Sequence, residues 1–116
     1  MERIIKAFFN SVRALKRLLA TEPAFRQEAI LFVIALPLAW LIAASWRGYL
    51  LLLGSIVVLM IVEVLNTGIE KACDAVSREF KTEIQLAKDC GSLAVLLAIA
   101  LALGVWGLAI AERLAQ

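Results

Sequence analysis

The feature that most constrains this chain is an acidic residue at the end of a long apolar run. Residues 50–62 contain no charged side chain, and Glu63 follows them directly. A carboxylate at membrane depth costs at least about 2.5 kcal/mol on insertion scales, so such residues usually serve a function. The plainer alternative places Glu63 at the membrane interface, with its side chain reaching water. We favour a functional Glu63 because its side chain is short and because more polar residues follow on the same face.

Three further polar residues share the helical face of Glu63. They are Asn66, Glu70 and Asp74. At about 100° per residue, the four side chains fall within roughly 80° of one another on a helix. We call these four residues the acidic stripe; it begins in the bilayer and continues out of it. The plainer alternatives are that Asn66 only joins helices and that the last two acids are solvated.

Composition sets the class of protein and narrows its chemistry. The chain has 116 residues and is 63% hydrophobic, whereas soluble domains are nearer half apolar. We therefore expect a single-domain, all-α integral membrane protein. The net charge of +2 suggests no nucleic-acid partner. Because the chain has no histidine, a base or metal ligand must be a carboxylate, which favours a hard cation such as Mg²⁺.

The pattern predicts an N-terminal helix lying on the membrane and three helices crossing it. Residues 3–19 alternate apolar and basic side chains at helical spacing, as interfacial helices do. The expected spans are residues 29–46, 49–66 and 92–111, within one domain, 1–116. We expect a tight turn at residues 47–48, a surface loop at 77–85, and Trp106 facing the far interface. The third span is rich in Ala and Gly, which allows close helix packing between copies.

The distribution of basic residues predicts the orientation. All Lys and Arg residues except Arg47 and Arg113 precede the first span or lie between the second and third. The positive-inside rule therefore places the N-terminus and residues 67–91 in the cytoplasm. Polar residues that could converge there are Glu22, Glu28, Glu63, Glu70, Asp74, Glu79, Lys88 and Asp89.

Such a cluster suits a Mg²⁺–nucleotide site, and a base at bilayer depth suits a lipid hydroxyl. The chain has no Walker A sequence and no G-x-G-x-x-G. If nucleotide binds here, it does not use the phosphate cradle of soluble kinases.

Four segments of the sequence resemble a known family. They are RIIKA at 3–7, EPAFRQE at 22–28, IVEVLNTGIE at 61–70 and AKDCGSLA at 87–94. The chain resembles the small bacterial integral-membrane diacylglycerol kinases, essentially over its whole length. The resemblance implies a homotrimer in the bacterial inner membrane. It also implies phosphorylation of diacylglycerol to phosphatidic acid, with ATP as co-substrate and Mg²⁺ as cofactor.

The resemblance also implies roles for individual residues. Glu63 would be the catalytic base, and Asn66 would position the substrate or the base. Glu22 and Glu70 would hold Mg²⁺. The expected nucleotide-binding residues are Arg3, Glu22, Glu70, Asp74, Glu79, Lys88 and Asp89, with Lys88 as the phosphate partner. The residues expected along the lipid-binding cleft are Gln27, Glu28, Glu63 and Ser92.

The sequence departs from the family at a few positions. Phe80 and Lys81 replace a Tyr-His pair of a well-known member, and Val12 and Leu19 replace tryptophans. Two alternative functions remain open. One is an undecaprenol kinase, since the same base would serve another lipid hydroxyl. The other is a non-catalytic small membrane oligomer in which the acidic stripe lines a pore.

Overall fold

The computed structural model describes residues 1–76, 79 and 81–116. Within these residues the chain forms four α-helices and no strand: α1 (Glu2–Thr21), α2 (Pro23–Ile42), α3 (Trp46–Val76) and α4 (Thr82–Ala115). The expected all-α fold is confirmed. The loop expected over residues 77–85 is wrong at its end, because residues 82–85 already belong to α4. Residues 77, 78 and 80 of that loop lie outside the described part.

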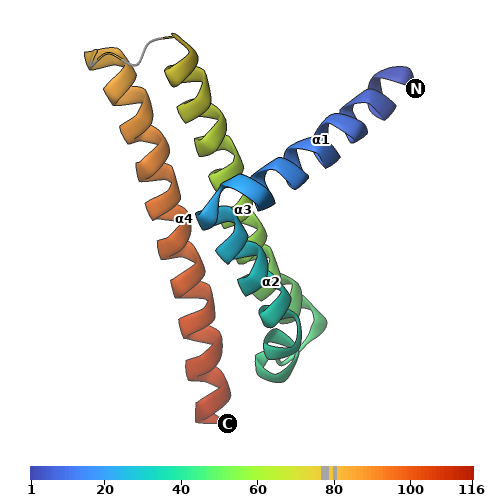
Figure 1. Cartoon of the computed structure of the whole chain (residues 1–116). Helices are drawn as coiled ribbons and strands as arrows, with labels where there is room; N and C mark the ends of the chain where they lie inside the picture. Colours follow the sequence, from blue (N-terminus) through green and yellow to red (C-terminus); the bar gives the residue numbers. More distant parts are fainter. Residues whose placement is uncertain (77–78, 80) are drawn as a thin grey trace.

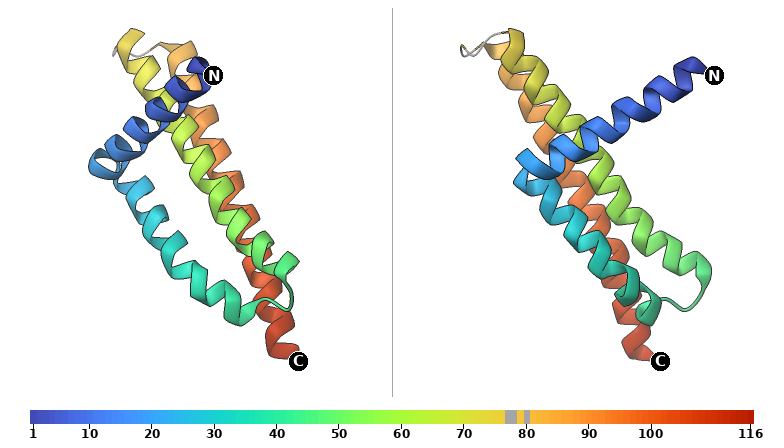
Figure 2. Two further views of the ribbon diagram at one scale, coloured as in Figure 1. Left: turned by 90° about the vertical axis from the view of Figure 1, so that its right-hand side faces the viewer. Right: turned by 45° about the vertical axis from the view of Figure 1, so that its right-hand side comes forward.

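The helices form a slender bundle with one projecting arm. Figure 1 shows α3 and α4 running side by side in opposite directions, with α2 against α3 and α1 extending away from the bundle. The further views in Figure 2 show the same arm and the same long α3–α4 pair. Helices α2, α3 and α4 are each long and apolar enough to cross a membrane. This arrangement confirms the expected amphipathic helix followed by three helices that could each span a membrane.

The side chain of Arg26 holds the corner between α1 and α2. Its Nε donates to the carbonyl oxygen of Leu19 at 2.9 Å, and its Nη2 donates to that of Ala20 at 3.0 Å. These carbonyls end α1 and lack partners within the helix, and a positive charge is favourable at this end of the helix dipole. Arg26 therefore fixes the direction in which α1 leaves the bundle.

The turn between α2 and α3 lies earlier than the sequence pattern suggested. We expected it at residues 47–48, but α2 ends at Ile42 and residues 47–48 belong to the first turn of α3. The hydroxyl oxygen of Ser45 accepts the backbone N–H of Gly48 at 3.1 Å. This is the bond that an N-cap serine makes to the third residue of a helix, so Ser45 starts α3.

Trp106 is turned into the bundle, so the expectation that it faces the far interface was wrong. Its indole N–H donates to the carbonyl oxygen of Leu52 at 3.1 Å and to the hydroxyl of Ser55 at 3.2 Å. An indole N–H in an apolar medium needs an acceptor, and α3 supplies two. The contact lies next to the buried core formed by Ala35, Ala39, Leu52, Leu53 and Ile56.

Candidate functional site

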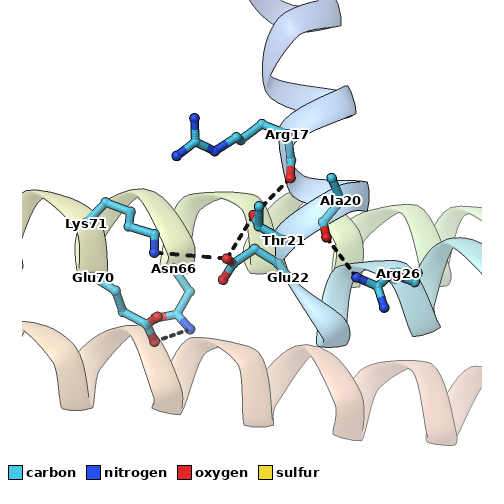
Figure 3. A network of polar contacts seen from close by, with 8 residues as sticks. All are labelled: Arg17, Ala20, Thr21, Glu22, Arg26, Asn66, Glu70 and Lys71. Carbon is cyan, nitrogen blue, oxygen red and sulfur yellow. Dashed lines mark hydrogen bonds and ion pairs between the residues drawn. The ribbon is translucent and has the colours of Figure 1, made fainter.

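The acidic stripe lies on the C-terminal half of α3, where the α1–α2 corner and the first half of α4 meet it. Asn66 is the best-buried member, with 8% of its surface exposed. Its amide nitrogen donates to a carboxylate oxygen of Glu70 at 3.3 Å (Figure 3). The two residues are one helical turn apart, so the regular geometry of α3 is sufficient to bring them together.

Glu63 is half-buried and lies among other carboxylates. The carboxylates of Glu70 and Glu22 are near enough to repel a negative charge on Glu63. Glu63 in turn is near enough to repel a negative charge on Glu28. One carboxylate oxygen of Glu28 is buried without a hydrogen-bond partner. Negative groups from α2, α3 and the α1–α2 corner therefore converge on one region. A cation placed there would relieve their repulsion.

Glu22 is the residue that joins α1 to α2. Its backbone is extended, with φ −111° and ψ 103°, and Pro23 follows as the first residue of α2. Its carboxylate accepts a hydrogen bond from the Thr21 hydroxyl at 3.1 Å and lies 4.0 Å from the ammonium group of Lys71 (Figure 3). Thr21 is therefore the last residue of α1, and Glu22 is the residue from which α2 starts.

Lys71 is a neighbour of the site that the sequence reasoning missed. It follows Glu70 directly and so falls outside the acidic stripe. Its pairing with Glu22 depends on how the α1–α2 corner sits against α3. No local sequence signal carries that information.

Lys88 and Asp74 are also brought together. The ammonium nitrogen of Lys88 lies 2.9 Å from a carboxylate oxygen of Asp74, and the pair connects α4 to α3. Their side chains are 41% and 44% exposed. The ion pair places the Lys88 ammonium group at the Asp74 end of the acidic stripe, one helical turn past Glu70 on α3.

The remaining candidate residues have exposed side chains. Arg3 lies in the first turn of α1, and that end of α1 points away from the other helices (Figure 1). The other candidates with exposed side chains are Gln27, Glu79, Asp89 and Ser92.

The donor set available to a metal is small. Among the described residues, no three acidic or cysteine side chains form a group that could hold a metal ion by themselves. Mg²⁺ bound with a nucleotide commonly takes only one or two carboxylates, with phosphates and water completing its shell. The carboxylate oxygens of Glu22 and Glu70 are hard donors, and they fit a site in which phosphates and water supply the other ligands of Mg²⁺.

The fold and the site together define a small helical membrane protein with a carboxylate-rich polar site at one end of its bundle. Comparison with known proteins narrows this class. The family model described as prokaryotic diacylglycerol kinase matches residues 9–110. The chain belongs to the prokaryotic diacylglycerol kinase family, as the resemblance implied, and the expectation of an enzyme is confirmed.

Similar proteins include several diacylglycerol kinases. The one from Escherichia coli is 38% identical over 104 residues, covering 90% of this chain and 85% of that protein. The one from Helicobacter pylori is 35% identical over 106 residues, covering 91% and 83% respectively. The one from Haemophilus influenzae is 30% identical over 107 residues, covering 92% and 91%.

Proposed function

We propose that this protein transfers the terminal phosphoryl group of ATP to the free hydroxyl of diacylglycerol, giving phosphatidic acid and ADP. The observation that carries the proposal is the position of Glu63. It ends an apolar membrane segment and lies half-buried beside the carboxylates of Glu22 and Glu70. A base at this depth suits an acceptor hydroxyl that is part of a lipid.

In this proposal Glu63 accepts the proton of the hydroxyl as its oxygen attacks phosphorus. A positioned general base typically contributes about 10²–10⁴-fold to a rate. Asn66 lies on α3 between the base, Glu63, and Glu70, which we assign below to the phosphate end of the site. The amide N–H of Asn66 holds the Glu70 carboxylate. Phosphoryl transfer depends mainly on positioning and on neutralising charge, so this fixed spacing is the main contribution of α3.

The phosphate end of the site is assigned to Glu22, Glu70 and Lys88. The two carboxylates would hold Mg²⁺, which when bound neutralises charge on the ATP phosphates. Lys88 would contact a phosphate directly, and Asp74 would hold its ammonium group until then. We assign Arg3, Glu79 and Asp89 to the nucleotide as well, on the family resemblance alone.

The lipid would approach from the apolar side of the bundle. An apolar groove of about 340 Å³ lies between α2, α3 and α4, and Leu31, Leu59 and Ile99 are among its lining residues. Leu31 follows Glu28 by one turn, and Leu59 precedes Glu63 by one turn. An acyl chain in this groove would bring the hydroxyl end of the lipid towards Glu63. Gln27 and Ser92 are the further residues assigned to the lipid-binding cleft.

The proposed location is the bacterial inner membrane, with the N-terminus and the site in the cytoplasm. The excess of Lys and Arg before the first span and between the second and third supports this orientation. The basic face of α1 would then lie against anionic lipid headgroups.

We propose a homotrimer in which each site is shared between chains. The support is the small-residue surface of α4 and the exposure of Asp89 and Ser92, which leaves both free to meet a neighbour. Inactive Glu63→Gln chains mixed with inactive Asp89→Ala chains should recover activity, with a maximum at an intermediate ratio. No recovery in verified mixed oligomers would show that both residues serve a site within one chain.

The lipid that receives the phosphoryl group distinguishes the candidate functions. Purified protein in mixed micelles is given radiolabelled ATP, Mg²⁺ and either diacylglycerol or undecaprenol. The proposal predicts label in phosphatidic acid and far less in undecaprenyl phosphate. The reverse preference would make the protein an undecaprenol kinase. Label in neither lipid would leave a non-catalytic membrane oligomer.

A further inference from the structure

The amide group of Asn66 is held between two helices. Its nitrogen donates to a carboxylate of Glu70 on the same helix. A carboxylate only accepts hydrogen bonds, so this contact fixes which end of the amide is nitrogen and which is oxygen. The oxygen is buried and has no hydrogen-bond partner. It lies against Gly91 of α4, which is also buried.

Gly91 leaves the space that this amide fills. A β-carbon built on Gly91 would overlap the Asn66 amide oxygen and would lie 3.1 Å from its Cγ atom. The other glycines of α4 differ in this respect. At Gly104 and Gly107 a β-carbon would meet nothing within 4 Å. The absence of a side chain at position 91 is therefore required by Asn66 and not by α4 itself.

We propose that Gly91 is a positioning residue for the phosphate end of the site. It allows Asn66 to lie against α4 with its N–H directed at Glu70, and Glu70 is thereby held in place. This inference rests on the proposed function, in which Glu70 holds the cation bound to ATP. Gly91 itself touches no reacting atom.

A β-carbon at position 91 has two possible consequences. Either the Asn66 side chain rotates away and its bond to Glu70 is lost, or α3 and α4 move apart at this level. Both consequences displace Glu70, which serves the nucleotide, and both act about two helical turns away from the groove residues Leu59 and Ile99. The effect should therefore appear in the use of ATP and Mg²⁺ more than in the use of the lipid.

The kinetic test compares Gly91→Ala with Gly104→Ala, which adds the same methyl group to the same helix in open space. We expect Gly91→Ala to lower kcat/KM for ATP by about tenfold or more, the size of one lost polar contact or more. The KM for diacylglycerol should change little. Gly104→Ala should resemble the wild type. Equal activity of the two variants would overturn the inference while leaving the proposed function intact.

A structural test does not depend on activity. The side-chain amide signals of Asn66 in an NMR spectrum are assigned by their loss in Asn66→Ala protein. They should shift in Gly91→Ala protein and stay in place in Gly104→Ala protein. Unchanged signals in the Gly91→Ala spectrum would overturn the inference. An inactive wild type with this same pattern of shifts would instead overturn only the proposed function.

A double variant covers the case in which Gly91→Ala protein does not fold. Asn66→Ala removes the group that the new methyl would meet, so the double variant Gly91→Ala/Asn66→Ala should fold as Asn66→Ala alone does. If the double variant also fails to fold while Asn66→Ala folds, the obstacle at position 91 is not Asn66. The inference would then be wrong.

Discussion

The ammonium group of Lys88 lies 2.9 Å from a carboxylate oxygen of Asp74, and this ion pair links the start of α4 to the end of α3. Both side chains are more than two-fifths exposed. An exposed pair of this kind contributes about 0–1 kcal/mol to stability. Its importance therefore lies in where it places a positive charge, beside the carboxylates proposed to hold the nucleotide.

Removing the charge of Lys88 should affect nucleotide use far more than folding. We expect Lys88→Met to raise the KM for ATP by about tenfold or more, because a charge-assisted bond to phosphate is lost. The unfolding midpoint in detergent should move little. Lys16→Met, on the exposed face of α1, is the control and should change neither quantity. A large loss of stability with normal KM would make the pair structural.

The two carboxylates assigned to the metal can be tested by titration with Mg²⁺. Glu22→Gln and Glu70→Gln should each shift the half-saturating Mg²⁺ concentration upward, because each removes one hard oxygen donor. Lys71→Met is the matched control, since it removes the partner of Glu22 without removing a donor. Unchanged titration curves for both Gln variants would show that the cation is held elsewhere.

The contact of Trp106 with α3 should stabilise the bundle. Trp106→Phe keeps an aromatic ring but removes the N–H that donates to Leu52 and Ser55. We expect a loss of about 0.5–1.5 kcal/mol in the free energy of unfolding, measured by denaturation in micelles. Trp46→Phe, at an exposed position, is the control. A loss that is no larger for Trp106→Phe would show that the N–H contributes nothing net.

The proposed orientation in the membrane can be tested by chemical labelling of introduced cysteines. Cysteine introduced at Arg47, in a background lacking Cys73 and Cys90, should react with an impermeant thiol reagent added to intact bacterial cells whose outer membrane has been made permeable. Arg47 lies in the first turn of α3, next to the turn that joins α2 to α3. Cysteine at Lys81, near the opposite end of the bundle, should react only after the cytoplasm is opened. The opposite result would invert the topology.

Local sequence patterns predicted the helices and the acidic stripe, but they did not predict the contacts between distant parts of the chain. The spacing of Glu63, Asn66 and Glu70 follows from helical periodicity, which depends only on neighbours in the sequence. The partner of Glu22 is Lys71, and that contact depends on the corner that Arg26 holds.

Two errors have specific physical causes. The turn between α2 and α3 was misplaced because Arg47 and Gly48 look like a turn, whereas the Ser45 hydroxyl starts the helix before them. Trp106 was assigned to the interface by residue type. Its contact with α3 depends on the rotation of α4 about its own axis, which the sequence pattern leaves open because α4 is apolar on nearly every side.

The most direct test of the central claim is transfer of radiolabelled phosphate from ATP to diacylglycerol by wild-type and Glu63→Gln protein. Glutamine keeps the size of the side chain but accepts no proton. We predict Mg²⁺-dependent labelling of phosphatidic acid by the wild type and a rate lower by about 10²–10⁴-fold in the variant, with ATP binding retained. Near-normal transfer by a folded Glu63→Gln protein, or no transfer by the wild type, would contradict the account.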